Sequence, residues 1–234
     1  MNAFGSLSKA LLHLVYPRVC AQCGWDLYED EEMLCLKCWM TLPKAAPTLC
    51  HPHLLQLFFG SCQWEMGILY LKMEKSGGVR QLIHDFKYHD SPEIGHYLGL
   101  KWGEFLLQYH PHLPWNGIVP VPMHPKKRRS RGYNQCDSIA AGFSSATGIP
   151  IIHHALIKSH HVDSQTKKGR MARMNINPFS VTNPALLEGK HILILDDVVT
   201  TGATLSCCYQ ALSKVSGLRC SAGALAYPIH NRLG

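Results

Sequence analysis

The 234-residue sequence contains no apolar stretch close to the roughly 20 residues that a membrane-spanning helix needs. Its opening segment has apolar residues at helical spacing but lacks a charged leader and a small-residue cleavage site, so no secretory signal is predicted. The chain also contains no internal repeat and no low-complexity tract. With 46% hydrophobic and 17% charged residues, this composition argues against extensive disorder.

The length is sufficient for one α/β domain of about 100 to 200 residues and a small appendage. We predict an amphipathic helix over residues 1–17, a zinc ribbon over 18–60 and the α/β domain over 61–234. The ten cysteines are unevenly placed, and four of them form two tight pairs. This arrangement favours metal binding in a reducing cytoplasm over a secreted disulfide framework.

Strand-like and helix-like segments alternate from Trp64 onward. Apolar runs typical of strands lie at 66–71, 117–121, 149–152, 192–195 and 220–226, and helical patterns lie at 79–88, 93–109, 134–146 and 204–215. This alternation predicts a mostly parallel sheet with helices on both faces. The polar, basic segment from Ser159 to Arg173 is typical of a long functional loop, and we expect it to act as a lid.

Two C-x2-C pairs, separated by eleven residues, predict a four-cysteine site made by Cys20, Cys23, Cys35 and Cys38. Four thiolates complete the tetrahedron that Zn²⁺ accepts and leave no position for water, so the ion is expected to be structural. The alternative is four reduced cysteines without a metal. An incomplete second set comprises Cys50, His53 and Cys62, whereas ordinary core positions are expected for Cys136, Cys207, Cys208 and Cys220.

The segment from Ile192 to Thr204 has the pattern of a phosphate site. An apolar strand ends in Asp196 and Asp197, and a turn of small residues then opens a helix. Ligands bind at the carboxyl edge of such strands, and the amides that begin the helix favour a phosphate. Because carboxylates accept hydrogen bonds from sugar hydroxyls, the pattern suits a ribose 5-phosphate. The alternative is a solvated acidic turn.

A second pattern is the basic cluster within six residues, which accounts for much of the formal net charge of +7. It consists of Lys126, Lys127, Arg128, Arg129 and Arg131. We expect this cluster to form a loop after the strand at 117–121. Such a localised basic loop indicates a phosphate ligand, and nucleic acid is the competing partner because clustered cations also attract a polyanion.

The run from Ile192 to Thr204 resembles the phosphoribosyl-pyrophosphate (PRPP) signature of type I phosphoribosyltransferases. The segments Ile118–Pro122 and Arg131–Gln135, together with Phe86–Tyr88 and the cysteine pairs, resemble the ComF family of competence-associated proteins. The resemblance implies the α/β phosphoribosyltransferase type I fold with an N-terminal zinc ribbon. It also implies that the acidic pair holds the ribose hydroxyls and that the 5-phosphate is held by Thr200, Thr201, Gly202, Ala203 and Thr204.

The resemblance further implies where the pyrophosphate binds. The cations expected near it are Lys87, Lys126, Arg128, Arg129 and Arg131, and the flexible-loop candidates are Gln165, Arg170 and Arg173. The loop departs from the family pattern, because Arg173 precedes Asn175 by two residues instead of three.

These relationships imply transfer of phosphoribose from PRPP, with Mg²⁺, to an acceptor that the sequence does not identify. The main alternative is a non-catalytic ligand sensor or adaptor in DNA uptake, with single-stranded DNA or DNA-uptake proteins as partners and a homo-oligomer as a candidate assembly. A third alternative is a zinc-ribbon scaffold with a vestigial site.

Overall fold

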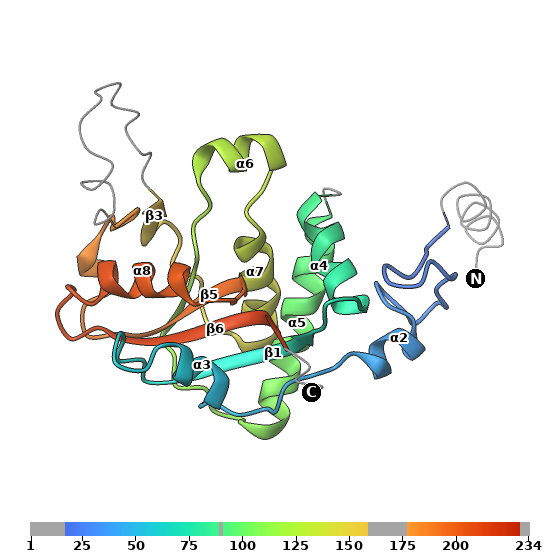
Figure 1. Ribbon diagram of the computed structural model, residues 1–234, viewed down its shortest axis with the longest axis horizontal. Helices are drawn as coiled ribbons and strands as arrows, with labels where there is room; N and C mark the ends of the chain where they lie inside the picture. Colours follow the sequence, from blue (N-terminus) through green and yellow to red (C-terminus); the bar gives the residue numbers. More distant parts are fainter. Residues whose placement is uncertain (1–16, 89–90, 159–176, 230–234) are drawn as a thin grey trace, which may run out of the picture.

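The computed structural model describes residues 17–88, 91–158 and 177–229 (Figure 1). The predicted N-terminal helix, apart from residue 17, lies outside these ranges, as does the whole predicted lid with Gln165, Arg170 and Arg173.

A four-stranded parallel sheet forms the centre, in the order β1-β6-β5-β2. The strands are β1 (Gly67–Met73), β2 (Gly117–Pro120), β5 (His191–Val198) and β6 (Arg219–Pro228). Ile192 to Leu195 are fully buried because both faces of the sheet are covered. The predicted strand at 149–152 was wrong, since only Ile151 bridges β2, and Pro150 lacks the N–H that a ladder needs.

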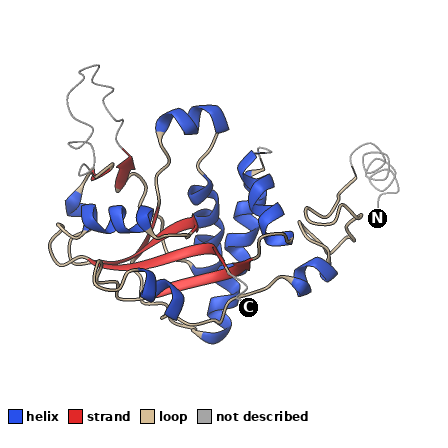
Figure 2. Cartoon of the chain, viewed as in Figure 1, coloured by secondary structure: helices blue, strands red, loops and turns tan. Residues whose placement is uncertain are grey.

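Helices cover both faces, as Figure 2 shows in blue around the red strands. One face packs against α4 (Gly78–Tyr88), α5 (Pro92–Tyr109) and α7 (Gln135–Thr147), and the other against α3 (Pro52–Leu57) and α8 (Ala203–Leu212). Helices α5 and α7 touch so closely that a Cβ at Gly142 would lie 1.9 Å from the His96 carbonyl oxygen. The predicted α/β class, a mostly parallel sheet flanked by helices, is confirmed.

The N-terminal part reaches the sheet through an extended segment. After α2 (Leu36–Thr41), residues 43–51 follow the free edge of β1, where Lys72 N–H donates to the Pro43 carbonyl at 2.7 Å and Gly67 N–H donates to the Leu49 carbonyl at 2.8 Å. This segment covers an edge that would otherwise expose unpaired backbone groups. Helix α3, which falls within the predicted 18–60 unit, then packs against β1.

The basic cluster was expected in a loop, and this expectation was wrong. It forms helix α6 (Pro125–Arg131), which stands away from the sheet on two connecting segments (Figure 1). Pro125 occupies the first turn, where its missing N–H costs nothing, and the His124 ring caps the helix by accepting from Lys126 N–H at 3.2 Å.

Short elements complete the described chain. An antiparallel pair, not predicted, comprises β3 (Leu156–Lys158) and β4 (Phe179–Val181), and a 3-10 turn, η2, spans Pro184–Leu186. Among the described residues, no helix has both the length and the apolar character needed to cross a membrane.

Candidate functional site

Asp196 and Asp197 lie near the end of strand β5, at the carboxyl edge of the sheet. Asp196 is buried, and its Oδ1 accepts the Asp197 N–H at 2.9 Å. Asp197 is more accessible, and its Oδ1 accepts the Val198 N–H at 2.7 Å. The two carboxylates therefore have different surroundings: Asp196 is held in the core, and Asp197 faces the opening of the site.

Two side chains from distant segments contact this acidic pair. Lys87, in the last turn of α4, places its Nζ 2.7 Å from Asp197 Oδ2. Cys136, in the first turn of α7, lies with its Sγ 3.6 Å from Asp196 Oδ1 and donates its S–H there. The Asn134 side chain fixes the start of α7 by donating to the Val121 carbonyl at 3.1 Å. From the sequence, only an ordinary core position was predicted for Cys136, because no local pattern indicates its contact with Asp196.

Burial, reinforced by the charge of Asp197, raises the pKa of Asp196 to about 7 although Cys136 and Lys87 oppose the shift. Because this folded-state pKa lies above the ordinary 3.8, the stability that Asp196 contributes is fully present below about pH 4 and is lost as pH rises through about 7.

A pH titration of stability tests this assignment. We expect Asp196→Asn, which cannot ionise, to gain roughly 1–3 kcal/mol of unfolding free energy relative to the wild type between about pH 5 and about pH 8. The measurement is urea denaturation of the ligand-free proteins across that range. Parallel curves for the two proteins would show that Asp196 is ionised with an ordinary pKa.

The loop after the acidic pair connects β5 to the start of α8. Thr200, Thr201 and Thr204 are exposed at the start of the helix, and Thr201 Oγ1 accepts the Ala203 N–H at 3.4 Å. Gly202 has φ of +76°, and a Cβ there would lie 2.6 Å from the Phe58 ring. Phe58, at the end of α3, thus forms a floor beneath the loop, a role that the sequence did not indicate. The free amides of a helix start and exposed hydroxyls can together hold a phosphate.

The predicted cations occupy two places. Lys87 meets the acidic pair, whereas the cations of α6 stand on a separate exposed helix, with Arg131 half-buried at its end. Arg128 lines a cavity of about 240 Å³ beside the end of β2, together with Asn134, Asp137, His153 and His154. This cavity is polar on the α7 side and apolar on the β2 side.

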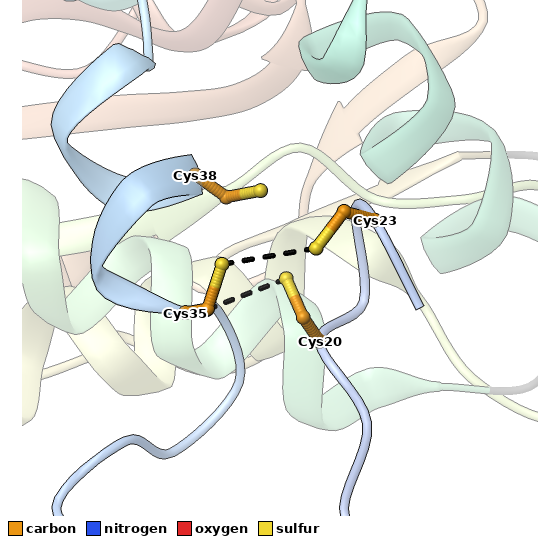
Figure 3. A group of neighbouring side chains, drawn as sticks. All are labelled: Cys20, Cys23, Cys35 and Cys38. Carbon is orange, nitrogen blue, oxygen red and sulfur yellow. Dashed lines mark hydrogen bonds between the residues drawn. The ribbon is translucent and has the colours of Figure 1, made fainter. Parts of the chain in front are cut away.

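The four N-terminal cysteines converge from two segments, as Figure 3 shows. Their sulfurs all lie within 4.8 Å of one another, and the Cys23 and Cys35 sulfurs are 3.7 Å apart. Four sulfurs at about 2.3 Å from a central zinc would be about 3.8 Å apart, so the set fits the ion. Burial raises the pKa of the Cys20 thiol, but hydrogen bonds from backbone N–H groups, led by that of Cys35, outweigh this effect and lower the pKa to about 7. Burial and the neighbouring thiols raise the pKa of Cys38, an effect that a dication would reverse.

The residues of the incomplete second set do not cluster in the described part of the chain. The groups with metal-ligand spacing there are the four-cysteine cluster and the trio of Cys136, Asp196 and Asp197, neither of which includes Cys50, His53 or Cys62. The rings of His51 and His53 instead pack against Tyr227, with centroids 5.3 and 5.1 Å away.

Several curated proteins are similar in sequence to this chain, although no family model matches it. Competence protein ComFC of Bacillus subtilis is 24% identical over 87% of this chain and 89% of its own length. DNA utilization protein YhgH of Salmonella typhimurium is 27% identical over 86% of each chain. Competence protein F of Haemophilus influenzae is 31% identical over 42% of this chain and 44% of its own. The resemblance to the ComF family is confirmed by these relatives.

Two solved structures are similar over part of their length. The allosteric regulatory enzyme of purine biosynthesis is 21% identical, with a TM-score of 0.40 over 55% of this chain and 25% of that chain. The glutamine PRPP amidotransferase from B. subtilis is 20% identical, with a TM-score of 0.42 over 60% of this chain and 30% of that chain. The matched region thus spans less than a third of either enzyme.

Proposed function

From the relationship to the ComF proteins and the geometry at the end of β5, we propose that the protein binds PRPP and acts as a phosphoribosyltransferase-like protein in DNA uptake. The supporting observation is the acidic pair at the strand end followed by an exposed threonine loop at the start of α8. Asp196 and Asp197 take the ribose hydroxyls, and the loop from Thr200 to Thr204 takes the 5-phosphate.

Two metal ions belong to the proposal. A structural Zn²⁺ is held by the four converging cysteines. Mg²⁺ would arrive with PRPP, whose oxygens would supply most of its ligands, because Mg²⁺ commonly takes few ligands from the protein. The ten cysteines are all unpaired, which supports a reducing, cytoplasmic location.

The proposed reaction transfers phosphoribose to an acceptor, and pyrophosphate leaves as the C1–O bond breaks. No covalent nucleophile is needed, since positioning and stabilisation of the departing charge supply the catalysis. Binding of PRPP tests the site, and release of pyrophosphate in the presence of nitrogenous acceptors tests turnover. Tight binding without release for every acceptor would favour a ligand sensor.

A non-catalytic DNA adaptor is the second candidate, favoured by one observation. Helix α6 presents Lys126, Lys127, Arg128 and Arg129 to solvent, away from the sheet. Such a surface binds single-stranded DNA with an affinity that falls steeply with salt. Neutralising these four side chains should abolish that binding, whereas unchanged DNA affinity would remove α6 as the contact.

A further inference from the structure

The four-cysteine cluster shares one apolar core with the helices that lie beside the acidic pair. Cys20 and Cys38 are buried in the same group of apolar side chains as Phe86 of α4. The Trp39 ring, next to Cys38 in the chain, meets the Tyr97 ring of α5 edge-on, with 6.1 Å between the two centroids. The N-terminal part of the protein is therefore packed onto α4 and α5.

One contact joins the cysteine cluster to the first residue of α4. Gln22 lies between Cys20 and Cys23, where the Gly24 N–H closes a turn by donating to the Cys20 carbonyl at 2.9 Å. The Gln22 side chain lies so close to Gly78 that a Cβ there would be 1.9 Å from its Nε2. Its Oε1 is buried and has no hydrogen-bond partner among the described residues. Such an oxygen is costly, so the fold of the turn holds this side chain against α4.

The other end of α4 reaches the acidic pair. Lys87, in the last turn, places its Nζ 2.7 Å from Asp197 Oδ2. The helix has 11 residues and is therefore about 16 Å long. Between its ends, Asp85 lines a cavity of about 480 Å³ together with Ala21 and Met33 of the N-terminal part. On this side α4 is thus supported mainly at its two ends, one at the cysteine cluster and one at the acidic pair.

We propose that the zinc state of the cysteine cluster controls ligand binding at the acidic pair through α4, with Gln22 as the positioning residue. In the zinc-loaded protein the turn of Gln22 is fixed, the start of α4 rests on it, and the end of α4 holds Asp197. In the zinc-free protein the turn loses its anchor, and α4 no longer holds Asp197 in place. This inference rests on the proposed function and the proposed zinc ion, and it makes PRPP affinity depend on zinc supply.

Amide hydrogen exchange and calorimetry test this coupling in the wild type, Gln22→Ala and Gln81→Ala. Each protein is measured with zinc bound and after removal of zinc by chelation and desalting. Exchange is followed at residues 82–88, and affinity is the dissociation constant for PRPP with Mg²⁺. Gln81 is exposed on α4 and donates to Asp85 Oδ1 at 2.9 Å within the helix, so Gln81→Ala controls for loss of a glutamine outside the contact.

The ratio of the zinc-free to the zinc-loaded dissociation constant measures the coupling. We expect a ratio on the order of 10 for the wild type, with exchange at 82–88 faster by a similar factor in the zinc-free protein. Gln22→Ala should keep one zinc per chain, because its side chain is not a ligand, yet its ratio should fall to about 1–3. Gln81→Ala should keep the ratio of the wild type.

A wild-type ratio near one, or an equal ratio in Gln22→Ala and the wild type, would overturn the inference. Zinc-loaded wild type that does not bind PRPP would overturn the proposed function, and exchange at 82–88 would still decide whether α4 depends on zinc. If zinc removal also exposes residues 192–195 to exchange, the whole domain has unfolded. The zinc-loaded proteins then decide, because unchanged exchange and affinity in Gln22→Ala would contradict the coupling.

Discussion

Replacing Gly202 by alanine is expected to disrupt the loop that we propose to hold the 5-phosphate. The backbone there has φ of +76°, which side chains rarely adopt, and the new Cβ would lie 2.6 Å from Phe58 Cε1 and 2.9 Å from Cζ. Strain and overlap together should lower the unfolding free energy by about 1–3 kcal/mol. Because the loop must shift to relieve the overlap, PRPP affinity should also fall by at least about tenfold. Urea denaturation and calorimetry measure the two effects.

Gly189→Ala is the matched control for backbone strain. Gly189 has φ of +67°, and a Cβ there meets nothing within 4 Å, so it shares the conformation but not the close approach. We expect it to cost stability and to leave ligand binding unchanged. If Gly202→Ala bound PRPP as tightly as the wild type, the Phe58 floor would have no part in shaping the loop.

Loss of one cysteine of the four-cysteine cluster should unfold the proposed zinc ribbon. In this unit Trp25, Tyr28, Leu36 and Met40 are 64% to 80% exposed, and Leu27, Leu34 and Leu42 are its buried leucines. This is a small apolar core for a unit that has to keep its fold without a metal. Cys38→Ser should therefore reduce the zinc content from one ion per chain to nearly none and remove hydrogen-exchange protection from residues 18–42. Metal analysis and amide exchange measure these changes.

Cys62→Ser is the control, because Cys62 is half-buried and lies outside the cluster. It should retain the metal and the protection. Protected amides in metal-free Cys38→Ser would contradict the account, since the ribbon would then be stable on packing alone.

The central parts of the fold and the site could be predicted because their signals are local. Spacing along a single segment is enough to identify the apolar run that ends in Asp196 and Asp197. The same holds for the two C-x2-C pairs. Parallel strands covered on both faces leave a continuous apolar run, which the sequence displays at Ile192 to Leu195.

The missed features depend on contacts between distant segments. Cys136 is 60 residues from Asp196, and Phe58 directly follows α3, within the predicted ribbon. Neither contact has a periodic or spacing signal, so each is set by tertiary packing. Helix α6 was missed for another reason: its side chains are nearly all charged and exposed, so it has no apolar face to reveal a helical period.

Calorimetric titration with PRPP, with and without Mg²⁺, tests the central claim most directly. It compares the zinc-loaded wild type with an Asp196→Asn, Asp197→Asn variant, which keeps the shape of both side chains and removes their charges. We predict Mg²⁺-dependent binding by the wild type and a loss of at least about 100-fold in the variant, since the ribose hydroxyls lose two carboxylate acceptors. Absence of binding by well-folded wild type, or equal binding by both proteins, would contradict the assignment of the PRPP site to the end of β5.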